Sequence, residues 1–260
     1  MKTQVLIAAL CKDPIKLLNE MKITSDAIIG NQCFKNDVEE LNYNGNQVLV
    51  YSFNERGVGL NRNNTLLRAS GDVAVLADDD MYFYENYEET LTKAYEKYPK
   101  ADVIIFNIEG GSQKRFKITR KMDINYWNVL RFGAARITFR TASIKNNGIF
   151  FNTEFGGGTP HSAGEDSLFL LDCLKKNLKI IALPESLACL KDEEVSSWFE
   201  GYTEKYFFDK GCFYGVAFKR FARIYAFLEI IKNRKRYQEF GNTNKVMNSV
   251  IQGIKYIRKR

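Results

Sequence analysis

Three consecutive carboxylates, Asp78, Asp79 and Asp80, follow a short apolar segment at residues 73–77. The apolar residues there do not alternate with polar ones, which is typical of a strand buried on both faces of a sheet. The carboxylates therefore emerge at a sheet edge, where open α/β folds bind their ligands. They repel one another unless water or a hard cation such as Mg²⁺ or Mn²⁺ compensates them. The run predicts a metal-bridged phosphate site, with an acidic surface turn as the alternative.

Predicted strands and helices alternate along the first half of the chain. The predicted strands are residues 4–10, 26–31, 47–52, 73–77 and 101–108, and the predicted helices are about 14–21, 60–69 and 86–98. This alternation favours a mostly parallel sheet with helices on both faces. The pattern breaks down over residues 110–158. A helix at 167–176 and a short strand at 179–184 follow.

The net charge of +7 is concentrated near the C-terminus. Residues 219–260 hold 12 Lys or Arg against 2 Asp or Glu, so this segment carries +10 and the rest of the chain −3. This asymmetry argues against nucleic acid in the main site and indicates a tail that meets an anionic surface. Apolar residues between Lys219 and Arg236 recur at helical spacing among basic ones. They predict a helix at an anionic membrane surface, or a helix that covers the core with its basic face in water.

The cysteines and the apolar runs bear on the compartment. The 5 cysteines include no C-x-x-C pair, which indicates reduced thiols rather than a disulfide framework. We interpret residues 5–10 as the first core strand rather than a signal peptide, because one basic residue precedes them and leucine stands before Cys11. No run approaches the roughly 20 apolar residues that span a bilayer. We expect a cytoplasmic protein, with peripheral contact to the inner face of the membrane.

Four blocks of the sequence, in order, resemble glycosyltransferase family 2, whose members share the GT-A nucleotide-sugar fold. Residues 5–14 resemble the family's opening strand and turn, without the usual Tyr-Asn, and residues 59–64 resemble its Ala-Arg-Asn helix start. Residues 69–80 match its Gly-Glu and DxD strand, and residues 164–169 match the Glu-Asp element that carries the base in inverting members. The resemblance covers about residues 3–190. It departs from the family at Met81, where many relatives carry a fourth acid, so it leaves open which aspartate contacts the metal.

The resemblance implies an α/β fold of the GT-A class, a Rossmann-like and mostly parallel sheet flanked by helices, with a C-terminal helical extension. Residues 1–195 would form the glycosyltransferase domain. Within it, residues 1–108 would be the nucleotide-binding half and residues 109–195 the acceptor-binding half. Residues 196–260 would form an aromatic and basic helical extension.

The same resemblance implies roles for the acidic residues. Mn²⁺ or Mg²⁺ would bridge the donor diphosphate and Asp80, with Asp78 reaching the ribose or the metal through water. Asp79, with Ala8 on the opening strand, is expected among the residues that bind the nucleotide. Asp166 is the expected general base, at the start of a helix whose positive end keeps its carboxylate charged.

Glu165 is the competing candidate for the base. Without the resemblance, Glu165 and Asp166 read as ordinary acids of a first helical turn. Arg62 and Asn63, near a helix start, are candidates to contact the diphosphate or the nucleotide base, or else belong to a surface helix. Asn31 occupies a position where relatives often carry an acidic residue that recognises the uracil base.

Four further residues are weaker candidates. Arg136 is a candidate ligand of a donor or acceptor phosphate, because guanidinium binds phosphate bidentately, and its alternative is a solvated basic residue. His161, the only histidine, precedes the expected base in a glycine-rich loop and is a candidate contact to metal or substrate, or else structural. Gly157 and Gly158 would let the chain approach a sugar closely, or merely bend.

We interpret the chain as an inverting, metal-dependent glycosyltransferase that moves a sugar from a nucleotide-sugar, with a UDP-sugar expected, to a saccharide or lipid-linked saccharide acceptor. The assignment to surface polysaccharide biosynthesis rests on analogy with bacterial relatives. One alternative is a sugar-phosphate nucleotidyltransferase, but residues 8–13 lack the glycine-rich basic loop typical of those enzymes. The other is a non-catalytic, membrane-associated nucleotide-sugar-binding module, against which the intact aspartate run argues.

Overall fold

The computed structural model describes residues 1–111, 116–191 and 201–259. The chain divides into two compact units. The first comprises residues 1–153 and 166–195, and the second comprises residues 154–165 and 196–260. The predicted domain boundary after residue 195 falls in the segment 192–200, outside the described residues.

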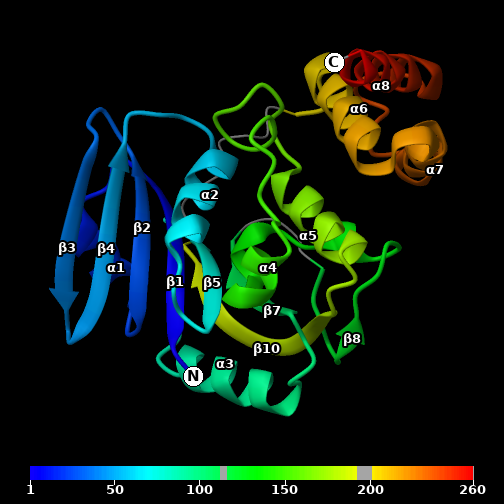
Figure 1. Cartoon of the computed structure of the whole chain (residues 1–260). Coiled ribbons are helices and arrows are strands. Elements are labelled where there is room, and N and C mark those ends of the chain that lie inside the picture. Colours follow the sequence, from blue (N-terminus) through cyan, green and yellow to red (C-terminus); the bar gives the residue numbers. More distant parts are fainter. Residues whose placement is uncertain (112–115, 192–200, 260) are drawn as a thin grey trace. The chain divides into compact units, whose positions relative to one another are not determined.

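A mixed sheet organises the first unit (Figure 1). Its strands are β1 (Thr3–Leu10), β2 (Asp26–Gln32), β3 (Asp37–Tyr43), β4 (Asn46–Phe53), β5 (Val73–Asp78), β6 (Met81–Phe83), β7 (Val103–Gly110), β8 (Met122–Asp123), β9 (Ile137–Arg140) and β10 (Ile180–Leu190). The order is β3-β4-β2-β1-β5-β9-β7-β10-β6, and β8 pairs with β10. Strands β4, β2, β1 and β5 are parallel, as are β7 and β10. The predicted mostly parallel sheet is confirmed.

Helices cover both faces of this sheet. They are α1 (Pro14–Met21), α2 (Val58–Arg68), α3 (Tyr87–Lys97), α4 (Thr141–Asn146) and α5 (Glu165–Lys175), with short 3₁₀ turns η1 (Val129–Arg131) and η2 (Ala134–Arg136). One face packs its valines and isoleucines against Leu17 of α1 and Tyr95 of α3, in a single apolar core. On the other face, which Figure 1 shows with α2, α4 and α5, Phe169 of α5 packs on Phe139 and Phe151 with ring centroids 5.8 and 4.3 Å apart.

Strands β3, β6, β8 and β9 were not predicted from the sequence. Strand β9 has four residues and lies antiparallel between β5 and β7, which supply its hydrogen bonds on both sides. Strand β3 lies at the sheet edge and pairs with β4. All its residues are exposed or half-buried, and its sequence is largely polar, so no apolar run marks it as a strand. Segment 110–158 therefore contributes a central strand, which local sequence pattern alone does not reveal.

The second unit is helical, as predicted for the extension. Its helices are α6 (Glu204–Phe218), η3 (Lys219–Phe221), α7 (Ala222–Asn233) and α8 (Thr243–Arg258). Helices α6 and α8 approach closely at glycines: a methyl group at Gly211 would lie 2.1 Å from the main-chain oxygen of Val250, and one at Gly253 would lie 2.0 Å from that of Phe208. Of the helices that the structure describes, none is both long and apolar enough to cross a bilayer.

Residues 154–165 belong to this second unit because they are tied to α6. His161 Nδ1 lies 3.0 Å from Asp209 Oδ1, and both side chains are buried. Asp209 also accepts hydrogen bonds from the Ser162 amide at 3.2 Å and from Lys205 Nζ at 2.5 Å. Burial alone would raise the pKa of Asp209, but these hydrogen bonds outweigh burial and hold the pKa below its ordinary value.

We predict that Gly253→Ala destabilises the protein. Replacing glycine with alanine inside a helix ordinarily stabilises it by roughly 0.5–1 kcal/mol, but here the added methyl group meets the α6 backbone. Overpacking should lower the free energy of unfolding by about 1–3 kcal/mol. Urea unfolding checks this, with Gln252→Ala at an exposed position of α8 as the control. A stabilised Gly253→Ala variant would contradict the close approach.

We also predict that Asp209 contributes to acid sensitivity. Its pKa is lower in the folded state, so its charge stabilises the fold above the unfolded-state pKa of about 3.9, and this stability is lost as pH falls through the folded-state pKa. Asp209→Asn should lower the free energy of unfolding at neutral pH by about 1–3 kcal/mol and flatten its loss in acid.

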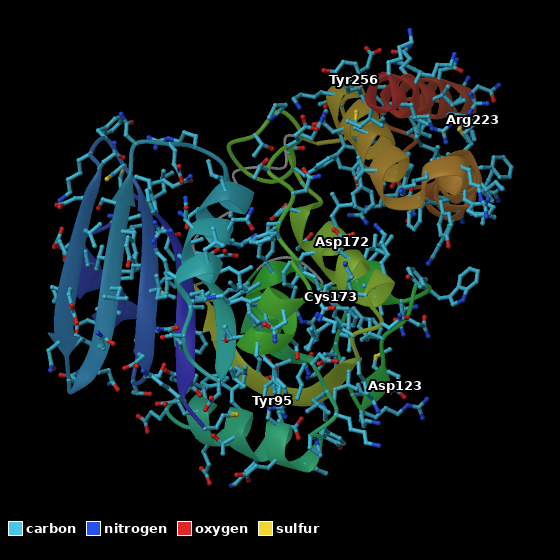
Figure 2. All side chains as sticks on the ribbon, viewed as in Figure 1. Tyr95, Asp123, Asp172, Cys173, Arg223 and Tyr256 are labelled. Atoms are coloured by element: carbon cyan, nitrogen blue, oxygen red, sulfur yellow. The ribbon has the colours of Figure 1, made fainter. Side chains whose placement is uncertain are left out.

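Unfolding measured over a series of pH values tests this effect. Asp123→Asn is the control, because Asp123 (labelled in Figure 2) is exposed and its ion pair with Lys121 is a surface contact of 3.8 Å. An Asp209→Asn variant with the acid sensitivity of the unmodified chain would contradict the prediction.

Candidate active site

The predicted carboxylates lie where the parallel strands end. Asp78 is the last residue of β5 and is paired in register with Ala8 of β1, which is paired in turn with Gly30 of β2. Ala8 is therefore the backbone neighbour of Asp78 at the carboxyl edge of the sheet. This edge is the usual ligand site of an open α/β fold, in agreement with the prediction.

Arg62 of α2 is the direct partner of Asp78. Its Nη2 donates to Asp78 Oδ1 over 2.6 Å, and its guanidinium lies 5.7 Å from the Phe151 ring centroid. Arg62 is only 4% exposed, whereas the Asp78 side chain is 36% exposed. A buried guanidinium thus holds a carboxylate that remains accessible from solvent, in a short charge-assisted hydrogen bond. Arg62 was predicted as a site residue from the sequence, but its pairing with Asp78 was not.

Asp79 and Asp80 join the run to neighbouring strands. Asp79 Oδ2 accepts from the main-chain amide of Leu10 at 3.1 Å and lies 3.7 Å from Lys12 Nζ. The main-chain oxygen of Asp80 accepts from the amide of Lys191 at 2.8 Å, next to the end of β10. These contacts link the run to β1 and β10, and Lys12 compensates part of its charge. The nucleotide contact predicted for Asp79 stays a prediction.

Asp166 lies at the start of α5, and its Oδ1 accepts from the Ser167 amide at 2.6 Å. A methyl group at Gly133 would lie 3.5 Å from Asp166 Oδ2, so the carboxylate sits beside the backbone that leads into η2. Turn η2 contacts β5, and β9, which follows η2, runs antiparallel to β5. These contacts bring Asp166 to the edge that carries Asp78.

Glu165, the competing candidate for the base, has a different environment. It is 8% exposed, and its Oε2 accepts from the Gly164 amide at 3.2 Å. Glu165 belongs to the second unit, whereas Asp166 belongs to the first. Gly164 has φ +123°, a left-handed conformation that favours glycine, and the chain turns there into α5. Burial makes Glu165 the less accessible carboxylate of the pair.

Three other candidate residues form hydrogen bonds to main-chain groups. Asn63 binds the Phe151 amide and carbonyl at 2.7 and 2.9 Å, and Asn31 binds the Lys12 amide and carbonyl at 3.1 and 2.8 Å. Arg136 is 5% exposed and donates to the Phe106 and Phe116 carbonyls and to Asn107 Oδ1. These bonds give each side chain a structural role. Their predicted ligand contacts stay predictions, and burial disfavours phosphate binding by Arg136.

His161, Gly157 and Gly158 all lie in the second unit. The contact with Asp209 gives His161 a structural role, and its buried Nε2 has no hydrogen-bond partner among the described residues. Its predicted metal contact stays a prediction. Gly158 has φ +77°, in the left-handed region, so the bend of this loop requires glycine there.

The acidic run fits a cation that is shared with a ligand. Among residues 1–111, 116–191 and 201–259, no group of three or more His, Cys, Asp or Glu side chains could hold a metal by itself. Mg²⁺ is usually bound by one or two carboxylates and completes its coordination with water and substrate phosphates. Asp78 and Asp80 are half-buried and supply oxygen donors at this edge, so the donor set suits a cation bound together with a diphosphate.

Lys12 and Gly133 were missed by sequence reasoning. Lys12 lies next to the predicted turn after the first strand, and only the register of β1 against β5 brings it to Asp79. Gly133 falls in the segment whose pattern is irregular, so no periodic signal pointed to its place beside Asp166.

Solved structures of S. aureus TarS resemble this chain. The structure of residues 1–349 in complex with UDP-GlcNAc has a TM-score of 0.64 at 17% identity, over 98% of this chain and 82% of that chain. The structure of residues 1–349 in complex with UDP has a TM-score of 0.59 at 14% identity, over 100% of this chain and 92% of that chain. A third TarS structure has a TM-score of 0.60 at 16% identity, over 94% of this chain and 45% of that chain. At these identities the likeness shows the fold, which confirms the predicted GT-A class.

The sequence itself matches a family model. No curated protein sequence matches this chain. The model of glycosyl transferase family 2 matches residues 34–163, which is half of the chain and includes the acidic run. The chain therefore belongs to glycosyl transferase family 2.

Proposed function

We propose that this glycosyltransferase is inverting and metal-dependent, and that it moves a sugar from a UDP-sugar to a saccharide or lipid-linked saccharide acceptor in surface polysaccharide biosynthesis. The observation that carries the proposal is the Arg62–Asp78 contact at the carboxyl edge of the sheet, on the same edge as Asp166. The UDP-GlcNAc and UDP complexes of S. aureus TarS, which has this fold, support a uridine donor. The family match favours sugar transfer over nucleotidyl transfer.

The acidic edge would bind the leaving diphosphate. Asp78 and Asp80 would hold Mn²⁺ or Mg²⁺, which when bound neutralises charge on the diphosphate. Arg62 keeps Asp78 in place from the buried side, so that the carboxylate does not have to be ordered when the donor binds. Ala8 presents no bulky side chain beside Asp78, which leaves room for the nucleotide at this edge.

Asp166 would act as the general base. The acceptor hydroxyl oxygen bonds to the anomeric carbon while the bond from that carbon to the diphosphate oxygen breaks, and the hydroxyl proton passes to the Asp166 carboxylate. Attack opposite the leaving group inverts the anomeric centre. The N-terminus of α5 and the Ser167 amide stabilise the charged carboxylate before the proton arrives.

The proposal includes membrane contact through the basic C-terminal segment. The seven Lys or Arg residues between Lys219 and Arg236 support it, because anionic lipid headgroups attract such clusters. Binding at the inner face of the membrane would bring the enzyme to a lipid-linked acceptor.

We predict that Asp166→Asn abolishes transfer while donor binding persists. The amide cannot accept the proton, so the turnover number should fall by about 10²–10⁴-fold. Donor affinity, measured by calorimetry, should be nearly unchanged because Asp78 and Asp80, the proposed metal ligands, are intact. Glu165→Gln is the control and should retain most activity. If Glu165→Gln abolishes transfer and Asp166→Asn does not, Glu165 is the base.

We predict that donor binding requires both a divalent cation and Asp80. A UDP-sugar with Mn²⁺ should raise the melting temperature, because a ligand bound to the native state stabilises it by mass action. Asp80→Asn should remove this rise. Asp172→Asn is the control, since Asp172 (labelled in Figure 2) forms a surface ion pair with Lys175 at 2.8 Å. An equal rise in the presence of EDTA would show that the site needs no metal.

A further inference from the structure

Helix α7 and the turn before it expose a continuous row of large apolar side chains. They are three or four residues apart, except for one adjacent pair, which places them on one side of the helix. They are Phe221, Ile224, Phe227, Leu228 and Ile231, each between 41% and 58% exposed. We call this row the α7 apolar face. The opposite side of α7 is buried through Ala222, Ala226 and Ile230, so the helix is already fixed in its unit without using the exposed row.

Basic side chains surround the α7 apolar face. Seven are exposed: Lys219, Arg220, Arg223, Lys232, Arg234, Lys235 and Arg236. None of them forms an ion pair with an acidic side chain of the described residues. The one acid in this stretch, Glu229, binds Lys210 Nζ at 2.6 Å and the Tyr237 hydroxyl at 2.5 Å instead. The charges around the face are thus of one sign and not compensated by acids of the described residues. Arg220 and Arg236 lie over the rings of Phe221 and Tyr202, at 4.8 and 5.5 Å. Arg223 is labelled in Figure 2.

We propose that the α7 apolar face lies on the surface of an anionic lipid membrane, with its apolar side chains at the headgroup boundary and the surrounding basic residues on the headgroups. The inference deepens the membrane contact of the proposed function, on which it rests, by assigning it to one helix face. An apolar helix side with lysine and arginine around it is the pattern of helices that lie in the interface plane. Exposed contiguous apolar patches mark interaction sites in general, and the surrounding charge selects the partner.

Charge decides between a membrane and a second copy of the chain. In a twofold dimer the same face would meet itself and bring the basic residues of both helices together, where like charges repel. An anionic bilayer offers an apolar layer beneath a layer of opposite charge, which complements both features of the face.

Helix α8 does not offer an equivalent surface. Its apolar residues Val246, Val250 and Ile254 are buried, Gly253 packs on α6, and of its large apolar side chains that the structure describes only Tyr256 is exposed, at 41%. Membrane contact therefore belongs to residues 219–236 rather than to the end of the chain, although α8 also carries basic residues.

The test is sedimentation of the full chain with vesicles of phosphatidylcholine alone and of phosphatidylcholine with phosphatidylglycerol. The variant Ile224→Glu/Leu228→Glu places two charges on the face at exposed positions that do not pack inside the unit. The control Asn244→Glu/Gln252→Glu changes the net charge equally at exposed positions of α8. We expect the unmodified chain and the control to bind the anionic vesicles, and the face variant to bind about tenfold or more weakly.

Sugar transfer to a soluble acceptor, measured on the same samples, separates this inference from the proposed function. The face variant should keep this activity, because the face lies outside the catalytic residues. No binding by the unmodified chain, equal binding to neutral vesicles, or equal loss in the α8 control would overturn the inference. So would size-exclusion chromatography that shows a dimer for the unmodified chain and a monomer for the face variant.

Discussion

The contact between Arg62 and Asp78 is the interaction on which the candidate site depends. The Arg62 guanidinium is almost fully buried, where an uncompensated charge is costly, and its short hydrogen bond to Asp78 pairs that charge with a carboxylate. The neighbours of Arg62 reach other elements: Asn61 Nδ2 donates to the Gly30 carbonyl at 2.6 Å, and Asn63 binds the Phe151 backbone. Three consecutive residues of α2 thus fix this helix over the carboxyl edge, where Arg62 meets the Asp78 that ends β5.

The three aspartates, which are chemically identical in the sequence, have different surroundings in the fold. Asp78 accepts a hydrogen bond from the buried Arg62, and Asp79 accepts one from the main-chain amide at the end of β1. The main-chain oxygen of Asp80 accepts a hydrogen bond from the residue that follows β10. Arginine and lysine therefore compensate part of the charge that a cation alone would have to balance. What remains is a partly exposed, oxygen-rich edge suited to a diphosphate and its metal, as proposed.

The second unit combines very close packing with an unusual surface. Glycines on α6 and α8 bring two backbones together, while α7 is packed through Ala222, Ala226 and Ile230 and presents its other large apolar residues outward. Its apolar and basic residues are interleaved in the sequence, and the helical repeat sorts them into a buried side, an apolar face and its basic surroundings. A fold that buried this face would have to neutralise the charges beside it, which the described contacts do not do.

Local period and composition were enough to predict most strands and helices of the first half, though not β3 or β6, together with the acidic run at a strand end and the basic helical C-terminal segment. The packed fold was needed to show that Ile137–Arg140 forms a central strand, that Arg62 pairs with Asp78, and that His161 contacts Asp209, 48 residues away. Each of these rests on a hydrogen bond or register between distant segments. Local periodicity carries no information about such partners, because they are brought together only when the sheet and the helices pack.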